Sequence, residues 1–225
     1  MEKPMKIIAH IRTDFPTKFG IPRQSGLAEF EATVVFEPEY RNDEALRGIE
    51  EFSHLWLLWK FSKAERDTWS PTVRPPRLGG NKRVGVFATR SPFRPNPIGL
   101  SSVKLLGVEK TNEGSVLRVS GADLMDGTPI YDIKPYLAFT DSHPDAAGSF
   151  ADVKKDYALS VDFPAELLSR IPKAKQEPLL ELLSEDPRPQ YIEDSDRVFG
   201  FPFANFEIKF TVMDGVLTVH EVTEL

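Results

Sequence analysis

The sequence predicts a mainly β protein with an α+β part, in which a single-sheet antiparallel β-barrel domain is followed by a small α+β C-terminal domain. Six to eight short apolar or alternating runs occur before residue 138, separated by glycine- and proline-rich turns. Short strands at such spacing favour a closed sheet over alternating β and α units. After residue 150 the pattern changes to a leucine-rich helical segment and a hairpin.

The totals are those of an ordinary soluble protein with one large or two small cores. The chain has 225 residues, of which 40% are apolar and 28% charged, so a disordered chain is excluded. It has no cysteine, which excludes disulfides, thiolate metal sites and cysteine nucleophiles. No apolar run is long enough for a membrane span, and the amino terminus lacks a signal core, so we expect a cytoplasmic protein.

The expected barrel strands have apolar alternation or β-branched runs bounded by breakers. They lie at 6–12, 27–36, 52–61, 83–88, 98–109, 115–120 and 130–137, with a short helix at 42–48. Asn42 or Asp43 would cap that helix, and Gly48 would close it.

The second part of the chain begins after a breaker-rich linker. We expect the domains at 1–138 and 151–225, with the linker at 139–150. Residues 164–183 are helical in pattern, with breaks at Pro172 and Pro178. Two strand-like runs flank Asp214-Gly215, a dipeptide that suits the positive φ values of a type I′ turn.

The chain is organised around a proline-rich loop, residues 88–100 (ATRSPFRPNPIGL). Its three prolines remove backbone donors and fix φ, so the loop is stiff and holds Arg90 and Arg94 in place. Rigid loops with polar groups on a sheet scaffold often carry function, but the same pattern also occurs in plain connectors.

Charge is distributed unevenly. The formal net charge is −6, yet the segment 66–104 has a single acidic residue, Asp67, and eight basic ones. Such a segment can hold a polyanion even on an acidic protein, although a solvated basic face remains the alternative. The basic residues are Arg66, Arg74, Arg77, Lys82, Arg83, Arg90, Arg94 and Lys104.

Several common active-site motifs are absent. There is no GxGxxG after a strand and no GxxxxGK[ST], so Rossmann and P-loop nucleotide sites are unsupported. The four histidines lack metal-ligand spacing, and we expect no metal. Asp123 and Asp126 could form an acid/base pair, or they could be turn residues that satisfy their own backbone.

At the proline loop the sequence resembles the TrmO family, also called YaeB or TsaA-like. The resemblance rests on long motifs in a fixed order and covers nearly the whole chain. These motifs are PRQ (22–24), FSHLW (52–56), PTVRPPRLGGN (71–81), VGVFATRS (84–91), FRPNPIG (93–99), DGTP (126–129), DIKPY (132–136) and DPRPQY (186–191).

The resemblance implies an S-adenosylmethionine-dependent tRNA methyltransferase that works as a homodimer. Members methylate the exocyclic N6 amine of N6-threonylcarbamoyladenosine beside the anticodon. The resemblance also implies which residues contact the cofactor, with the role of Ser25 through its backbone. They are Arg23, Gln24, Ser25, Lys63, Ala64, Arg90, Leu100, Asp123 and Leu124.

Arginine suits the carboxylate of the cofactor, Asp123 its ribose or amino group, and the two leucines its base. Asn96, followed by Pro97, is the candidate catalytic residue, since it could accept from the target amine and orient its lone pair. Phe93 could stack on the base or belong to the core. Arg94 could serve tRNA phosphate, the partner subunit or the fold of the loop itself. We expect the basic segment and the DPRPQY motif to hold tRNA.

Two other function classes stay open from the residues alone. One is a non-catalytic RNA-binding module that has kept the barrel. The other is a methyltransferase for a small molecule, for which the basic segment would be incidental.

Overall fold

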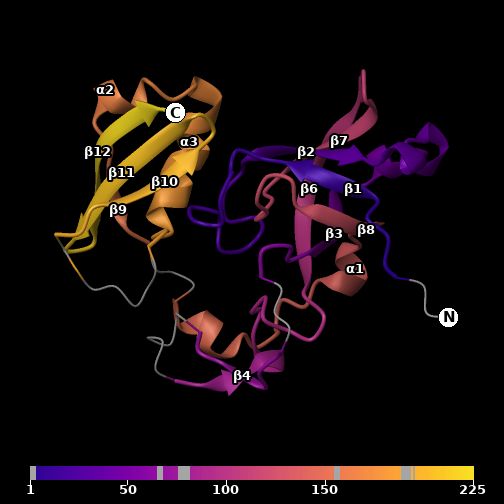
Figure 1. The fold of residues 1–225 in the computed structure, drawn as a ribbon, viewed down its shortest axis with the longest axis horizontal. Coiled ribbons are helices and arrows are strands. Elements are labelled where there is room, and N and C mark those ends of the chain that lie inside the picture. Colours follow the sequence, from indigo (N-terminus) through magenta and orange to yellow (C-terminus); the bar gives the residue numbers. More distant parts are fainter. Residues whose placement is uncertain (1–3, 65–67, 76–81, 155–157, 189–193, 195) are drawn as a thin grey trace.

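The computed structural model describes residues 4–64, 68–75, 82–154, 158–188, 194 and 196–225. Figure 1 shows a ring of strands on one side and a second sheet with its helices on the other. The segment that contains β4 lies apart from both. The structure thus confirms the predicted fold class. Within the described residues, no helix combines the length and apolarity needed to cross a membrane.

The first domain is a closed six-stranded barrel in which every neighbouring pair is antiparallel. The ring closes where β1 pairs with β8, through Ala9 opposite Ile130 and His10 opposite Pro129. In ring order the strands are β1 (Ala9–Arg12), β2 (Glu31–Phe36), β7 (Gly114–Ser120), β6 (Ile98–Thr111), β3 (His54–Lys60) and β8 (Pro129–Pro135).

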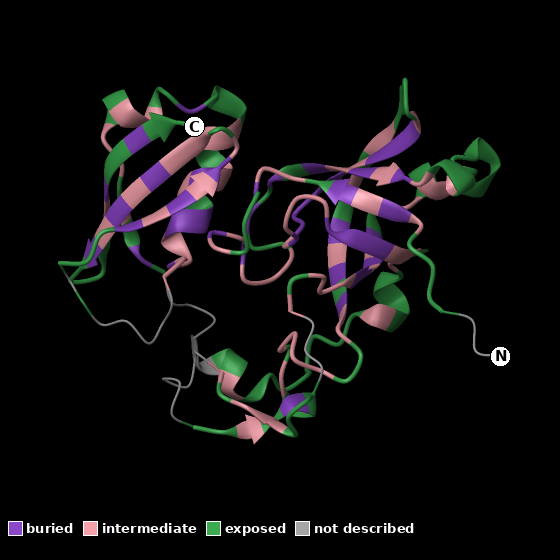
Figure 2. Cartoon of the chain, viewed as in Figure 1, coloured by how far each residue is buried: buried purple, intermediate pink, exposed green. Residues whose placement is uncertain are grey.

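Alternation along each strand fills the barrel interior. In β3 the side chains of Leu55, Leu57 and Trp59 are buried while their neighbours face outward. Because successive strand residues point to opposite faces, this alternation separates a barrel core from a partly solvated wall. Figure 2 shows the buried bands alternating along the strands.

Three connections leave the barrel from the same rim: 13–30, 61–97 and 121–128. Since neighbouring strands are antiparallel, the carboxyl ends of β1, β3 and β7 lie at the rim where β2, β6 and β8 begin. The connection 121–128 joins β7 to β8, which are not neighbours, so it must cross the end of the barrel. Ala122 and Leu124 are buried there in the barrel core.

The connection 61–97 carries a two-stranded ribbon of β4 (Thr72–Val73) and β5 (Val84–Gly85). The predicted strand over 83–88 is wrong beyond Gly85, because the chain turns there into the 3₁₀ helix η5 (Val86–Ala88). Both the amide and the hydroxyl of Thr89 donate to the Val86 carbonyl, which tightens this turn.

The predicted helix over 42–48 is a series of short 3₁₀ turns instead. These are η1 (Pro38–Tyr40), η2 (Asp43–Leu46) and η3 (Ile49–Glu51). Asn42 caps η2 as expected, with its side chain accepting from the Glu44 amide at 3.0 Å. Gly48 closes the turn with φ of 83°.

The second domain packs helices against a four-stranded sheet in the order β10-β11-β12-β9. Its elements are β9 (Ser160–Asp162), α2 (Ala165–Leu168), α3 (Lys173–Ser184), β10 (Phe199–Phe203), β11 (Phe206–Met213) and β12 (Val216–Glu224). Asp214 and Gly215 have φ of 49° and 78°, as the predicted hairpin turn requires. The predicted break at Pro178 is wrong, because this proline lies inside α3.

The two domains share a core through the connection 13–30. Phe15 and Phe30 are buried against Phe203, with ring centroids 5.8 and 5.2 Å from it. The Ala204 amide donates to the Asp14 carbonyl at 2.8 Å, and Lys175 forms an ion pair with the Asp14 carboxylate. The connection 13–30 is therefore fixed by the C-terminal domain as well as by the barrel.

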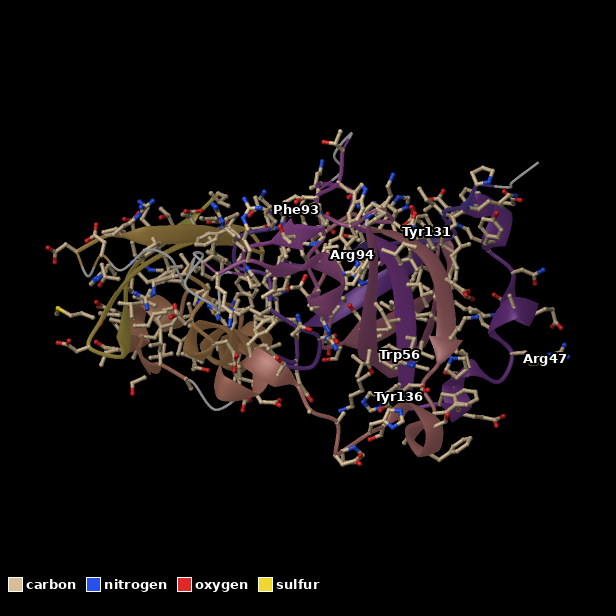
Figure 3. All side chains as sticks on the ribbon, turned by 90° about the horizontal axis from the view of Figure 1, so that it is seen from below. Arg47, Trp56, Phe93, Arg94, Tyr131 and Tyr136 are labelled. Carbon is tan, nitrogen blue, oxygen red and sulfur yellow. The ribbon has the colours of Figure 1, made fainter. Side chains whose placement is uncertain are left out.

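The expected linker 139–150 begins in a helical turn, α1 (Ala138–Asp141), and reaches η6 (Ser149–Lys154). The Asp141 carboxylate accepts from the Trp56 indole at 2.8 Å, which ties α1 to the barrel wall. Figure 3 shows Trp56 beside Tyr136 on that wall. The domain limits 1–138 and 151–225 stay a prediction.

Gly99 provides a test of the barrel interior. A Cβ at Gly99 would lie 2.2 Å from Cε2 of Trp59, so Gly99→Ala must displace that buried indole. We expect the free energy of unfolding to fall by about 1–3 kcal/mol, as overpacking does. Urea denaturation measures it. Gly85→Ala is the matched control, because a Cβ there meets nothing within 4 Å and its φ of −60° suits alanine. Equal stability of the two variants would contradict this packing.

Candidate functional site

The rim with three connections also holds a cavity of about 1400 Å³. Most of its wall comes from the connection 61–97, including the proline loop. Gln24 comes from the connection 13–30, and Phe150 comes from η6. The lining residues are Gln24, Ala64, Thr68, Trp69, Ser70, Thr72, Val73, Arg74, Pro75, Arg83, Thr89, Arg90, Ser91, Pro92, Phe93, Arg94, Pro95, Pro97 and Phe150.

The proline loop is held from inside by Arg94. Its guanidinium donates to the Thr89 carbonyl at 2.7 Å and to the carbonyls of Val86 and Ser91 at 3.4 Å. Of the three roles open for Arg94, the structure therefore favours the fold of the loop itself. Figure 3 shows Arg94 beside Phe93 at this end of the barrel.

The connections 13–30 and 121–128 approach one another closely at Gly26 and Gly121. The Gly26 amide donates to the Gly121 carbonyl at 2.9 Å. Gly121 has φ of 81°, and a Cβ on it would lie 3.4 Å from the Gly26 backbone. Because glycine adopts positive φ without strain and has no side chain, the residues before Gly26 can lie against those after Gly121.

This contact brings four of the expected cofactor residues together. A guanidinium nitrogen of Arg90 donates to Oε1 of Gln24. The backbone of Ser25 donates to the Asp123 carboxylate, which also feels the charge of Arg90. Residues from all three rim connections thus form one polar cluster, and the backbone role expected for Ser25 fits its position.

Asp123 is the unusual member of this cluster. Burial raises the pKa of its carboxyl above the ordinary value of 3.8, and the hydrogen bond from Ser101, the Ser25 amide and Arg90 offset only part of this. Ser101 donates to Asp123 at 2.5 Å and accepts from the Trp59 indole at 2.9 Å. A partly buried carboxylate is therefore fixed in orientation through the barrel core.

Asp126 has a structural role instead of pairing with Asp123. Its carboxylate accepts from the Thr13 amide at 3.0 Å, and its own amide donates to the Phe15 carbonyl at 2.8 Å. For Asp126 the turn interpretation therefore applies, while Asp123 is the candidate for chemistry.

Arg23 is engaged with the C-terminal domain. Its guanidinium donates to the carbonyl of Asp186 and, at 3.4 Å, to that of Arg188. Asp186 is 4% exposed, has a positive φ of 54° and holds Arg188 through two hydrogen bonds of 2.8 and 2.9 Å. Burial alone would raise the pKa of Asp186, but Arg188 outweighs it and the pKa is lowered.

This contact changes the interpretation of the DPRPQY motif. We expected it to hold tRNA, but Asp186 and Arg188 brace the loop that carries Gln24 and Ser25. Residues 189–191 lie outside the described residues. The same holds for Arg66, Arg77 and residues 76–81 of the longest motif.

The remaining expected residues lie at different depths. Ala64 lines the cavity and Lys63 is exposed beside it. Leu100 is 57% exposed on the outer wall of β6, opposite Leu58. Leu124 is 1% exposed inside the barrel, so its side chain does not reach a ligand in this structure, and only its backbone is available.

Asn96 is exposed at the tip of the proline loop. Its carbonyl accepts from the Ile98 amide at 2.8 Å. Its side-chain amide forms no hydrogen bond with any residue that the structure describes. Pro95 and Pro97 on either side line the cavity, so the Asn96 side chain stands at its edge and is available to a ligand.

Sequence reasoning missed Ser101, which orients Asp123. A signal was present, since Ser101 occupies an inward position of β6 between buried Gly99 and Val103. An inward serine in an apolar register needs a hydrogen-bond partner, and that partner is Asp123 here. The Asp186 contact had no such signal, because 163 residues separate it from Arg23.

The cluster suits an organic ligand that carries both charge signs. Arg90 and the loop amides can receive a carboxylate, while the desolvated Asp123 can receive an ammonium or hydroxyl donor. Among the described residues no group of three or more His, Asp or Glu side chains could hold a metal ion.

Both domains of the chain match domains of known proteins. Residues 10–142 match the tRNA-methyltransferase O N-terminal domain, and residues 156–225 match the TrmO C-terminal domain. The tRNA (adenine(37)-N6)-methyltransferase of Escherichia coli is 42% identical over 216 residues, which cover 92% of each chain. A probable S-adenosyl-L-methionine-binding protein of Methanothermobacter thermautotrophicus is 39% identical over 63% of this chain and 96% of its own.

Solved structures extend the similarity to the arrangement of the two domains. The crystal structure of TrmO from Pseudomonas aeruginosa superposes with a TM-score of 0.81 at 32% identity. The match covers 100% of this chain and 98% of that one. With both domain types matched in order and nearly the full length aligned, this chain belongs to the TrmO family.

Proposed function

We propose that this protein is an S-adenosylmethionine-dependent tRNA (adenine37-N6)-methyltransferase. The carrying observation is the polar cluster in which Arg90 and Asp123 meet between three rim connections, on a chain 42% identical to the Escherichia coli enzyme. At finer level we propose the N6 nitrogen of N6-threonylcarbamoyladenosine as the methyl acceptor.

The cluster fits S-adenosylmethionine by the chemistry of its groups. The cofactor has a carboxylate, an ammonium, ribose hydroxyls and an adenine. Arg90 and Gln24 offer donors for the carboxylate, and Asp123 offers a partly buried acceptor. We propose that Arg23 acts through its loop, and that Lys63, Ala64, Leu100 and Leu124 complete the surroundings.

Bound S-adenosylmethionine supplies an electrophilic methyl group on a positively charged sulfur. The task of the protein is then to place the acceptor nitrogen in line and to exclude water. Asn96 can accept from the N6–H and turn the nitrogen lone pair toward the methyl group. Because Arg94 braces the stiff loop, Asn96 loses less conformational entropy when it positions the amine. With the cofactor bound, the sulfur–methyl bond would break as the nitrogen–methyl bond forms, leaving a neutral thioether, and the amine proton would pass to solvent at the exposed edge where Asn96 lies.

The basic segment supports a polyanionic substrate. Arg74, Lys82 and Arg83 are exposed on the ribbon beside the cavity. Single-stranded loop bases are accessible to pockets of this kind, since they need no strand separation. We further propose a homodimer and a cytoplasmic location, as the family implies.

Mass analysis of tRNA nucleosides tests the proposal directly. tRNA from a strain that lacks the gene should gain one methyl group on N6-threonylcarbamoyladenosine when the purified protein and S-adenosylmethionine are added. Asn96→Ala should lower this turnover at least tenfold while leaving cofactor affinity unchanged, because Asn96 is assigned to the acceptor. Full turnover by Asn96→Ala would remove the catalytic role of this residue.

Calorimetry with S-adenosylmethionine, together with the nucleoside analysis, separates the rival functions. An RNA-binding module would bind tRNA but give no heat with millimolar S-adenosylmethionine in calorimetry. A small-molecule methyltransferase would bind the cofactor and leave every tRNA nucleoside unmethylated.

Asp123→Asn should change the stability of the fold and the affinity for S-adenosylmethionine in opposite directions. The native carboxyl has a raised pKa, so between pH 3.8 and that raised value the folded state holds a proton that the unfolded state has lost. Stability therefore falls as pH rises through this window in the wild type, and asparagine has no such proton. At pH 7 the variant should melt higher yet bind S-adenosylmethionine more weakly.

Melting temperatures between pH 4 and 8 and calorimetry at pH 7 measure the two effects of Asp123→Asn. Parallel melting curves for variant and wild type would contradict the desolvated carboxylate. Unchanged cofactor affinity would contradict its role in binding.

Arg23→Ala tests whether the C-terminal domain braces the cofactor loop. Loss of the hydrogen bonds to Asp186 and Arg188 should free Gln24 and Ser25 and weaken S-adenosylmethionine binding about tenfold. Calorimetry with S-adenosylmethionine measures the affinity.

The control for Arg23 is Glu221→Ala, which removes the exposed Lys209 ion pair elsewhere in the C-terminal domain. Its cofactor affinity should not change. If Glu221→Ala weakened binding as much as Arg23→Ala does, general destabilisation of the domain would explain both results.

A further inference from the structure

An exposed aromatic pair, Trp69 and Phe87, lies at the edge of the cavity and has no part in the cofactor cluster. Their ring centroids are 6.2 Å apart with an angle of 29° between the planes, so the rings stack on each other. Trp69 is 53% exposed and Phe87 is 72% exposed. Large apolar side chains gathered in the open usually mark a binding surface.

The pair is held in place by ordered backbone. Thr72 pairs with Gly85 in the β4–β5 ribbon, and the Val86 amide donates to the Pro71 carbonyl at 2.9 Å. Val86 is 1% exposed and anchors the turn that carries Phe87. Since Trp69 precedes β4 and Phe87 follows β5, the ribbon fixes the spacing of the two rings.

Positive charge surrounds the pair. The Arg94 guanidinium carbon lies 5.9 Å from the Phe87 ring centroid. Arg74 and Arg83 line the adjoining cavity wall, and Lys82 is exposed on the same ribbon. None of these four cations pairs with a carboxylate in the described part of the chain. Arg94 donates to backbone carbonyls of the loop, which leaves the charges of Arg74, Lys82 and Arg83 available to an anion.

Aromatic faces next to unpaired cations fit one ligand class better than others. Bases of single-stranded nucleic acid stack on aromatic rings while basic side chains hold the neighbouring phosphates. A purely apolar protein partner would leave the cations desolvated without counter-ions, which is costly.

We propose that Trp69 and Phe87 form a platform on which an unpaired base of the anticodon loop stacks, with Arg74, Lys82 and Arg83 on the adjoining phosphates. The proposal rests on the proposed tRNA substrate. It assigns a second base contact, separate from the adenosine that receives the methyl group.

Binding of a synthetic anticodon stem-loop RNA tests the platform. Trp69→Ala and Phe87→Ala should each raise the dissociation constant for the RNA on the order of tenfold, which is the typical loss of affinity when one stacked base loses its aromatic partner. Trp69→Phe keeps an aromatic face and should bind close to the wild type. A series of stem-loops with 2-aminopurine at single loop positions should lose fluorescence on the wild type at one position and keep it on the double variant.

Two comparisons separate stacking from charge and from general surface effects. Phe139→Ala removes the 89% exposed ring of α1 and should leave RNA affinity unchanged. The salt dependence of binding should keep its slope in Trp69→Ala, whereas Arg83→Ala should lower the slope by about one unit. Cofactor affinity should stay that of the wild type in all of these variants.

Three outcomes would overturn the proposal. If the double variant binds and methylates RNA as the wild type does, the platform is wrong and the proposed function stands. If the wild type binds no stem-loop RNA, the proposed function fails and the platform fails with it. If the double variant loses RNA affinity only together with self-association in sedimentation, the rings are a contact between two copies.

Discussion

The architecture of the site depends on closure of the barrel by the short β1–β8 pairing. Once Ala9 lies opposite Ile130, six antiparallel strands have no free edge, and three long connections must leave from one rim. One of them has to cross the barrel end because β7 and β8 are not neighbours. That crossing brings Asp123 to the connection that carries Ser25 and to the one that carries Arg90. The polar cluster therefore follows from strand order.

The connection 13–30 joins the two domains into one site. Its Phe15 and Phe30 are buried in the core of the C-terminal domain, whereas Gln24 and Ser25 contact the proline loop and Asp123. Arg23 sits between these ends and donates to the Asp186 carbonyl. The C-terminal domain therefore holds this connection in place through packing, and none of its described residues lines the cavity.

Much of this could be predicted from the sequence where local chemistry decides the structure. A continuous apolar run predicted β3, and Asp214-Gly215 predicted the hairpin, because both depend on neighbours along the chain. Pro178 was mispredicted as a break because burial of Leu179, Leu182 and Leu183 offsets the lost hydrogen bond, and burial is a tertiary term. The expected site residues were placed by family resemblance, and their roles stay predictions. Distant contacts such as Arg23 with Asp186 leave no local pattern.

The energetics of Asp123 explain why the barrel tolerates a carboxylate so close to its core. Burial raises its pKa, so the folded state is destabilised at neutral pH, yet Ser101 and the Trp59 indole hold it in place. A fold selected for stability alone would place a neutral residue there. Under the proposed function, this cost is offset when a donor or cation of the ligand binds the carboxylate, because Ser101 has already oriented it. The proposed function therefore converts stability lost at Asp123 into binding energy at the point where three connections meet.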